Sequence, residues 1–205
     1  MEPSDRFQDI DSLLSLLGVR RLRENLYEPR RLGLRDAGRT AYRRGNAGEF
    51  DDLAERYGAA LDRGEFAPLE ARLIGGGLGW GLFAAEPLAA GGLIGEYLGV
   101  VRPARRARAL PGGGFTTDYA WGFPGLGWPF LRLEIDAREA GGPLRFANHA
   151  FDASAGAEHL EFRGRWRVFF VAGRDIAAGE EITVDYGMEY WAGGRRELVL
   201  PDGTA

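Results

Sequence analysis

Apolar residues recur at two different periods along the chain, and the change of period divides it near residue 70. Before that point they repeat every three to four residues, in one stripe over Ile10–Leu17 and in another over Phe50–Leu61. This spacing predicts amphipathic helices that end near Gly18 and Gly64. We therefore interpret residues 6–70 as helical, a cap on the domain that follows.

Arginine-rich sequence lies between the two apolar stripes, from Arg20 to Arg44, and Pro29 and several glycines interrupt it. A solvated part of the helical cap is one interpretation. The other is a separate arm that contacts acidic partners through Arg20, Arg21, Arg23, Arg30 and Arg31.

Short apolar runs separated by glycine and proline make up the sequence after residue 70. The runs expected to form strands are Gly81–Ala85, Leu93–Val101, Leu131–Ile135, Trp166–Val171 and Glu181–Val184. Two similar turn segments, residues 86–92 and 174–180, each lead into a strand, and residues 111–114 and 123–129 are expected loops. The fold class is thus mostly β with a helical N-terminal extension. We divide the chain into an extension (1–70), a β domain (71–192) and a short tail (193–205).

Composition excludes several classes of protein. The chain has 205 residues, 32 glycines, two histidines and no cysteine. Disulfides and cysteine-bound zinc are therefore impossible, and no metal site is expected. The formal charge of −4 does not suit a dedicated nucleic-acid binder. The sequence shows no membrane-length apolar run and no signal-peptide pattern, which predicts a cytoplasmic protein with no membrane contact.

Two glycine-containing segments open the β domain. Gly79-Trp-Gly-Leu-Phe83 places two residues without side chains where a strand begins, so a ligand can approach the backbone closely. Taken alone, this segment is more typical of a β-turn. Glu96-Tyr-Leu-Gly99 follows, and by itself it fits a half-buried strand with a packed tyrosine.

Two further segments lie near the end of the domain. Arg145-Phe-Ala-Asn-His149 sets an amide beside an imidazole, a pair that elsewhere is usually a polar contact within a loop. Gly179-Glu-Glu-Ile-Thr-Val-Asp-Tyr-Gly187 reads as a turn followed by an edge strand that ends in a tyrosine.

In this order, the four segments resemble the SET domain of S-adenosylmethionine-dependent protein lysine methyltransferases. The resemblance covers about residues 75–192 and implies a β-clip fold of short strands with a C-terminal pseudoknot. The pattern is most similar to compact viral and bacterial members that lack cysteine-bound zinc. One departure is plain: Ala150–Ser154 replaces the Ser-Cys-x-Pro-Asn of the family motif.

The resemblance implies a role for each matching residue. Tyr186 and Tyr97 would be catalytic, beside the transferred methyl group and in the lysine channel. The expected channel also contains Tyr190 and Val184. Tyr119 is a further channel candidate that could as well be an aromatic residue of a core strand. The expected cofactor contacts, which bind S-adenosylmethionine and then S-adenosylhomocysteine as product, are Gly79, Trp80, Gly81, Asn148, His149 and Trp191.

The implied reaction is methyl transfer to a lysine amine. An aromatic channel beside a cationic sulfonium favours the neutral amine, because burial and like charge both oppose the ammonium form. Val184 is small, so di- or trimethylation is expected. The expected partner is a protein that carries a target lysine, such as a histone, histone-like or ribosomal protein, and the enzyme is a possible homodimer.

Other readings of the sequence stay open. One is an inactive SET-like module that binds peptide or cofactor, which the changed residues Ala150–Ser154 favour. Another is nucleic-acid binding through Arg102–Arg108, although direct contact with nucleic acid is not expected. The composition suggests a bacterial source, and action on histones would instead require a nuclear or host-delivered enzyme.

Overall fold

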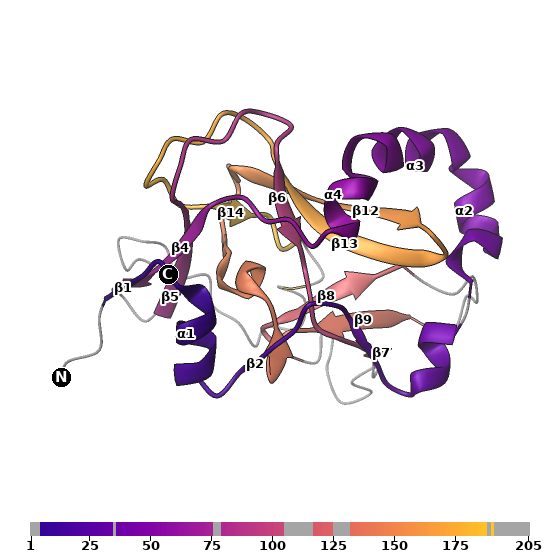
Figure 1. Cartoon of the computed structure of the whole chain (residues 1–205), viewed down its shortest axis with the longest axis horizontal. Coiled ribbons are helices and arrows are strands. Elements are labelled where there is room, and N and C mark those ends of the chain that lie inside the picture. Colours follow the sequence, from indigo (N-terminus) through magenta and orange to yellow (C-terminus); the bar gives the residue numbers. More distant parts are fainter. Residues whose placement is uncertain are drawn as a thin grey trace.

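The computed structural model describes residues 5–34, 36–75, 79–104, 117–124, 132–187 and Tyr190. The described part of the protein is built mostly from short strands, with helices concentrated before residue 63 (Figure 1). No helix in these ranges is long and apolar enough to cross a membrane.

The strands are β1 (Arg6–Phe7), β2 (Arg20–Arg21), β3 (Leu26–Tyr27), β4 (Leu69–Ile74), β5 (Gly79–Ala84), β6 (Leu93–Glu96), β7 (Val100–Pro103), β8 (Ala120–Phe123), β9 (Leu133–Asp136), β10 (Ala140–Gly141), β11 (Asn148–His149), β12 (Ala155–Phe162), β13 (Arg165–Ala172) and β14 (Thr183–Val184). The α-helices are α1 (Ile10–Leu16), α2 (Ala41–Gly45), α3 (Ala47–Leu53) and α4 (Ala59–Asp62). The other helical turns are η1 (Arg30–Leu34), η2 (Ala37–Arg39), the π-helical η3 (Ala54–Gly58) and η4 (Pro143–Phe146).

Within the described ranges, the strands form four small sheets. The largest has the order β11-β14-β12-β13-β6 and contains the long antiparallel pair β12–β13. A second sheet has the order β3-β7-β9-β8, a third β1-β4-β5, and β10 pairs with β2. The two turn segments expected from the sequence meet each other, because Leu88 and Ile176 exchange backbone hydrogen bonds of 2.9 and 2.8 Å.

A late strand passes between two earlier ones near the end of the domain. β14 runs parallel to both β11 and β12, with Val184 opposite His149 on one side and opposite Ala155 on the other. β14 therefore lies between β11 and β12, although both precede it in the sequence. This is the knot-like crossing that the motifs predict, and it brings residues 148–149 and 183–186 together.

The N-terminal segment is helical at the two apolar stripes, but it also supplies strands. β1 pairs with β4, β2 with β10 and β3 with β7. The prediction that all of residues 6–70 are helical was wrong at these three places. Short segments beside an open sheet edge satisfy their backbone groups by pairing, as when the Leu26 N–H donates to the Gly99 carbonyl over 3.1 Å. The division of the chain at residue 70 stays a prediction.

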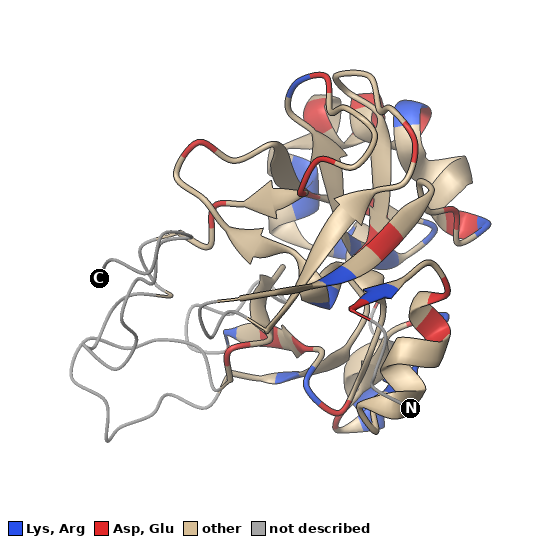
Figure 2. Ribbon diagram, turned by 90° about the vertical axis from the view of Figure 1, so that its left-hand side faces the viewer, with Lys and Arg blue, Asp and Glu red and all other residues tan. Residues whose placement is uncertain are grey.

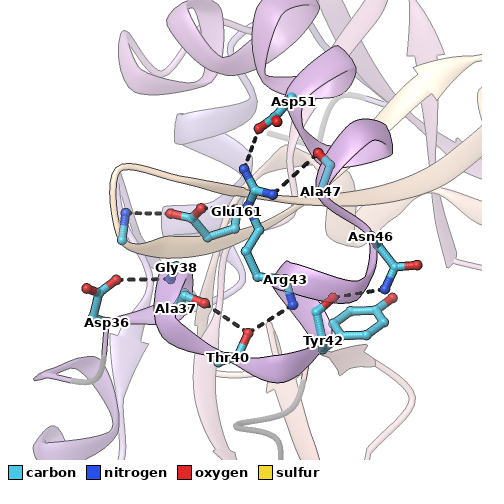
Figure 3. A network of polar contacts seen from close by, with 11 residues as sticks. Asp36, Ala37, Gly38, Thr40, Tyr42, Arg43, Asn46, Ala47, Asp51 and Glu161 are labelled. Carbon is cyan, nitrogen blue, oxygen red and sulfur yellow. Dashed lines mark hydrogen bonds and ion pairs between the residues drawn. The ribbon is translucent and has the colours of Figure 1, made fainter.

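The helices α2, α3 and α4 lie over the β12–β13 hairpin (Figure 1). Arg43 at their centre donates to the Glu161 carboxylate of the hairpin at 3.0 Å and also pairs with Asp51 of α3 (Figure 3). Thr40 caps α2 by accepting from the Arg43 N–H at 3.1 Å. One guanidinium thus joins two helices to the sheet, which positions the extension against the domain.

The run Leu93–Val101, predicted as one strand, is two strands in different sheets. β6 pairs with β13, whereas β7 pairs with β9. Glycine allows the change of direction: Gly95 has a φ of +151°, and a Cβ at Gly99 would lie 2.6 Å from the Asp136 carbonyl oxygen. Tyr97 lies at the bend between the two sheets, so a residue of the predicted site occupies the connection itself.

Candidate active site

Aromatic rings from two facing sheets meet beside Tyr97. Trp121 comes from β8 and Phe170 from β13, and their ring centroids are 5.5 Å apart. The Tyr97 ring lies 6.0 Å from Trp121 and 5.7 Å from Phe170. Tyr97 and Phe170 are buried in the core, while Trp121 stays half-exposed.

The end of the knot closes one side of this ring cluster. Tyr186 presents its ring edge-on to Trp121 at 6.1 Å, and Tyr190 packs on Tyr186 at 4.5 Å. A pocket opens between these rings, and Val184 and Ala147 also line it. Five separate parts of the sequence therefore build one aromatic pocket.

Both predicted catalytic tyrosines hold their hydroxyl protons against backbone carbonyls. The Tyr97 hydroxyl donates to the Tyr119 carbonyl at 2.8 Å, and the Tyr186 hydroxyl donates to the Ala147 carbonyl at 2.7 Å. Burial, followed by the nearness of another tyrosine, raises the pKa of each hydroxyl. Each phenol is therefore neutral at physiological pH, and its oxygen lone pairs stay available to accept from a guest in the pocket.

Tyr119 was predicted to contribute its ring to the channel, but it contacts the site through its backbone. Its backbone receives the Tyr97 hydroxyl, while its ring, about one-third exposed, lies 4.1 Å from the Arg145 guanidinium. Arg145 is buried, lines the pocket and donates to the Ala137 carbonyl at 3.0 Å. Burial lowers the pKa of this guanidinium.

Three of the predicted cofactor residues, Gly79, Trp80 and Gly81, lie in β5, one edge of which is partly open. This strand ends its three-stranded sheet, and residues Glu180–Ile182 cover its outer edge only from Leu82 onward. The Leu82 carbonyl accepts from Ile182 at 2.7 Å, and alternate residues of a strand point their backbone groups the same way. The N–H and C=O of Trp80 therefore face an edge that no described strand covers. The Trp80 ring packs on Phe7 at 5.4 Å, so its backbone is the part that a ligand can use.

Glycine keeps this edge accessible. Gly79 has a φ of +75°, a conformation that favours glycine. A Cβ on Gly81 would lie 2.3 Å from Ile74 Cδ1 and 3.0 Å from Glu181 Oε1. Gly81 is therefore required because Ile74 and Glu181 already occupy the space of a side chain. Gly79, in contrast, is favoured by its backbone conformation and has open space beside it.

Asn148 and His149 lie in β11, beside the strand that enters the knot. The Asn148 amide donates from Nδ2 to Glu181 Oε1 at 2.9 Å. His149 Nδ1 accepts from the Tyr186 N–H at 3.2 Å. Burial lowers the pKa of His149, which favours the neutral ring that this contact requires. His149 therefore holds the backbone of Tyr186 in place, and Trp191, the last predicted cofactor contact, lies outside the described residues.

Comparison with protein-family models finds one match that spans most of the motifs. The model described as "SET domain" matches residues 79–187, just over half of the chain. The chain belongs to the SET-domain family.

Curated relatives give the same family at moderate identity. A protein of Yarrowia lipolytica named "Histone-lysine N-methyltransferase, H3 lysine-4 specific" is 38% identical over 127 residues, which is 57% of this chain and 10% of that protein. The protein of the same name from Saccharomyces cerevisiae is 37% identical over 120 residues, 54% of this chain and 10% of its own length. The chain thus spans about a tenth of these relatives. Both are fungal, so they lend no support to the expected bacterial source or the viral and bacterial likeness.

Solved structures agree on the fold. The ATXR5 SET domain in complex with histone H3 dimethylated on R26 superposes with a TM-score of 0.64 at 24% identity, covering 88% of this chain and 86% of that one. At this identity the likeness establishes the SET-domain fold. The mostly β fold predicted from the sequence is confirmed.

Several residues of the site were missed by sequence reasoning, among them Arg145 and Ala147 of the pocket. Trp121 and Phe170 line the pocket, and Glu181 contacts Asn148. Trp121 lies two residues after Tyr119, a spacing that places both on one face of a strand, and this was the only local signal. Glu181 lies within the motif Gly179–Gly187, but the motif gave it no role of its own, and nothing near Phe170 in the sequence marks that residue as part of a site.

Proposed function

We propose that this protein is a lysine N-methyltransferase that acts on proteins and uses S-adenosylmethionine. The observation that supports the proposal most is the aromatic pocket in which Tyr97 and Tyr186 donate their hydroxyl protons to backbone carbonyls. A lysine side chain is a long apolar stem that ends in one amine, and a narrow ring-lined pocket suits that shape.

The residues at the β5 edge fit the proposed cofactor. The amino-acid end of S-adenosylmethionine carries an ammonium and a carboxylate, which need acceptors and donors respectively. Trp80 offers a backbone carbonyl and N–H on an open edge, and Asn148 offers an amide. Gly79 adds no side chain to this edge, and nothing lies within 4 Å of the place where its Cβ would be. When bound, the cofactor supplies a methyl group activated by its sulfonium.

The pocket contributes alignment and desolvation to the proposed reaction. Tyr97 is buried and Tyr186 is half-buried, and their pocket is lined mainly by aromatic rings, with Arg145 and Asp118 beside them. Burial among these rings disfavours the ammonium form of a guest lysine and lowers its pKa. The hydroxyl oxygen of Tyr186 and the Ala147 carbonyl can accept from the amine or from a polarised methyl group. The residues thus hold the reacting atoms in line without a strong base.

The proposed substrate class is histone H3 or a protein that resembles its tail. The named fungal relatives are histone H3 methyltransferases, and the solved neighbour is in complex with histone H3. Action on a histone would place this protein where chromatin is, so we propose nuclear action in place of the cytoplasmic location expected from composition. Acidic and basic residues are mixed over the described ribbon (Figure 2), so charge does not single out another partner.

We infer di- or trimethylation from Val184. This side chain is buried, lines the pocket and has no hydroxyl. A small apolar residue leaves space for a methylated amine to turn and react again. Trp121 lines the same pocket and is the residue most able to reduce that space.

The alternative of an inactive binding module rested on the changed residues after His149. These residues keep the knot well hydrogen-bonded. Ser154 Oγ donates to the Glu181 carbonyl at 3.2 Å and accepts from the Thr183 N–H at 3.0 Å, and the Ala150 N–H donates to Val184. The substitutions therefore leave the pocket supported, which favours the enzyme.

The composition of the protein makes a direct assay unusually clean. All 26 basic residues are arginine, so the protein has no lysine side chain of its own. Labelled S-adenosylmethionine with core histones or an H3 tail peptide should label lysine in the substrate and leave no methyl-lysine in the enzyme. Mass spectrometry locates the modified residue. Binding of cofactor without transfer to any lysine-bearing substrate would contradict the proposed activity.

A further inference from the structure

Glu181 has no role in the reaction proposed above, although its carboxylate lies at the proposed cofactor site. We call this site, formed by Gly79–Gly81 of β5 and Asn148, the cofactor edge. Glu181 lies opposite Phe83 of β5 in an isolated antiparallel bridge. Its Oε1 is 3.0 Å from the place where a Cβ of Gly81 would be. Its side chain is therefore next to the glycine surface, although the sequence separates the two by about a hundred residues.

The backbone around Glu181 is firmly held. Its carbonyl accepts from Ser154 Oγ at 3.2 Å, and the next residue, Ile182, donates its N–H to the Leu82 carbonyl at 2.7 Å. Both bonds join Glu181 to elements of the core. The position of its carboxylate is therefore set by the fold before any ligand binds.

The carboxylate has one hydrogen-bond partner among the described residues, the Nδ2 of Asn148 at 2.9 Å. It is half-buried, and burial raises its pKa. An ionised carboxylate only accepts hydrogen bonds, so it selects the NH2 end of the Asn148 amide and excludes the carbonyl end. Glu181 thereby determines which way this amide faces.

The remaining end of that amide is the acceptor Oδ1, and no described residue donates to it. The Trp80 carbonyl, on the open edge of β5, is a second acceptor without a strand partner among the described residues. An amide oxygen beside a carboxylate, together with a backbone acceptor one residue before Gly81, suits a ligand ammonium, which has three N–H donors and a positive charge.

We propose that Glu181 is a positioning residue of the cofactor site, which holds the Asn148 amide so that Oδ1 accepts from the α-ammonium of S-adenosylmethionine. The inference rests on the proposed function, because it assumes this cofactor. Glu181 should therefore affect the affinity for ligands that carry the amino-acid end, and only while Asn148 is present.

Calorimetry with two probes tests this role. S-adenosylhomocysteine carries the amino-acid end, and 5′-methylthioadenosine lacks it. Glu181→Gln keeps size and shape, but its amide can donate as well as accept, so Asn148 loses its fixed orientation. We expect the Kd for S-adenosylhomocysteine to rise about tenfold, the effect of one charge-assisted hydrogen bond, and the Kd for 5′-methylthioadenosine to stay unchanged.

Two further variants make the test specific. Glu180→Gln is the matched control, because its side chain accepts from the Ala177 N–H in the preceding turn and should leave both affinities unchanged. Glu181→Asp keeps the charge but shortens the side chain by one methylene, so it should raise the Kd for S-adenosylhomocysteine as Glu181→Gln does. It also serves if Glu181→Gln fails to fold, which thermal unfolding would show.

A double-mutant comparison separates positioning from direct contact. In the Asn148→Ala background, Glu181→Gln should change the Kd for S-adenosylhomocysteine by less than about threefold, since its target is gone. An undiminished effect there would overturn the positioning role. Wild-type affinity in Glu181→Gln would overturn it while leaving the proposed function intact. Failure of the wild-type protein to bind S-adenosylhomocysteine would instead overturn the proposed function, and the inference with it.

Discussion

The aromatic pocket and the cofactor edge share the segment Glu181–Tyr186, but they differ in what they are made of. One is formed mainly by side chains and the other mainly by backbone. The pocket consists of side chains, with rings from β8, β13 and the end of the knot around Tyr97. The cofactor edge consists of backbone, the bare strand at Gly79–Gly81, completed by one amide and one carboxylate.

This difference in composition predicts that the pocket controls the turnover rate and that the edge controls the affinity for the cofactor. In the pocket, the phenol oxygens are fixed by backbone carbonyls, and so is the Arg145 guanidinium, so these groups can align a guest without binding it tightly. At the edge, the polar atoms face an open strand and can hold a zwitterion. Changes in the pocket should therefore alter turnover, and changes at the edge should alter cofactor affinity.

The sharpest test of this contrast removes the Tyr186 hydroxyl. Tyr186→Phe keeps the ring but loses the donor to Ala147 and the oxygen that faces the pocket. Turnover on a histone H3 peptide should fall by about 100-fold or more, while the Kd for S-adenosylhomocysteine stays within about twofold. Steady-state kinetics and calorimetry measure the two effects.

Tyr57→Phe is the matched control, since Tyr57 also donates to a backbone carbonyl, that of Gly91, at 2.9 Å. It should cost about 1 kcal/mol of stability and leave turnover unchanged. Near-native turnover in Tyr186→Phe would remove Tyr186 from the site.

The opposite result is expected at the edge. Asn148→Ala removes the amide that Glu181 holds, and the Kd for S-adenosylhomocysteine should rise about 10- to 30-fold. Turnover at saturating cofactor should fall much less. Asn25→Ala, which removes an acceptor for the Gly99 N–H, is the control and should lower stability only. Unchanged affinity in calorimetry would show that Asn148 does not touch the cofactor.

A smaller effect is expected from opening the pocket. The Tyr190 ring packs on Tyr186 at 4.5 Å, so Tyr190→Ala should admit water and reduce kcat/KM by about tenfold. Cofactor affinity should not change. Tyr42→Ala, in the distant ring cluster around Phe50, should lower thermal stability without this kinetic effect. Wild-type kcat/KM in Tyr190→Ala would show that this ring does not close the pocket.

The smallest expected effect on rate is a change of product. Val184→Tyr should fill the pocket near the amine and shift the end product to monomethyl-lysine, with the first transfer slowed by no more than a few-fold. Val184→Ile, which adds volume without a hydroxyl or ring, is the control. Mass spectrometry of the peptide at long incubation reads the result. A wild-type end point of monomethyl-lysine would indicate that Trp121 already occupies the space.

The sequence was sufficient to predict a helix or strand wherever the pattern within one segment determines its structure. The apolar stripe of α1 and the run that forms β13 appear as predicted, because each buries one continuous face. The run Leu93–Val101 failed, since a strand pattern does not reveal that its two halves pair with different partners. The same limit applied to the arginine-rich segment, where sheet edges formed elsewhere turned short pieces into strands.

By itself, the sequence determined the family and the bare backbone of the cofactor edge. The four motifs stand in order, and glycine at 79 and 81 allows a close approach whatever lies nearby. Tertiary structure alone decided that Glu181 holds Asn148, that Trp121 and Phe170 complete the pocket, and that Tyr119 offers its carbonyl in place of its ring. These contacts join segments that are far apart in the sequence. They depend on the register with which β14 enters the knot and on how two sheets face each other, and neither is written in the local pattern of any one segment.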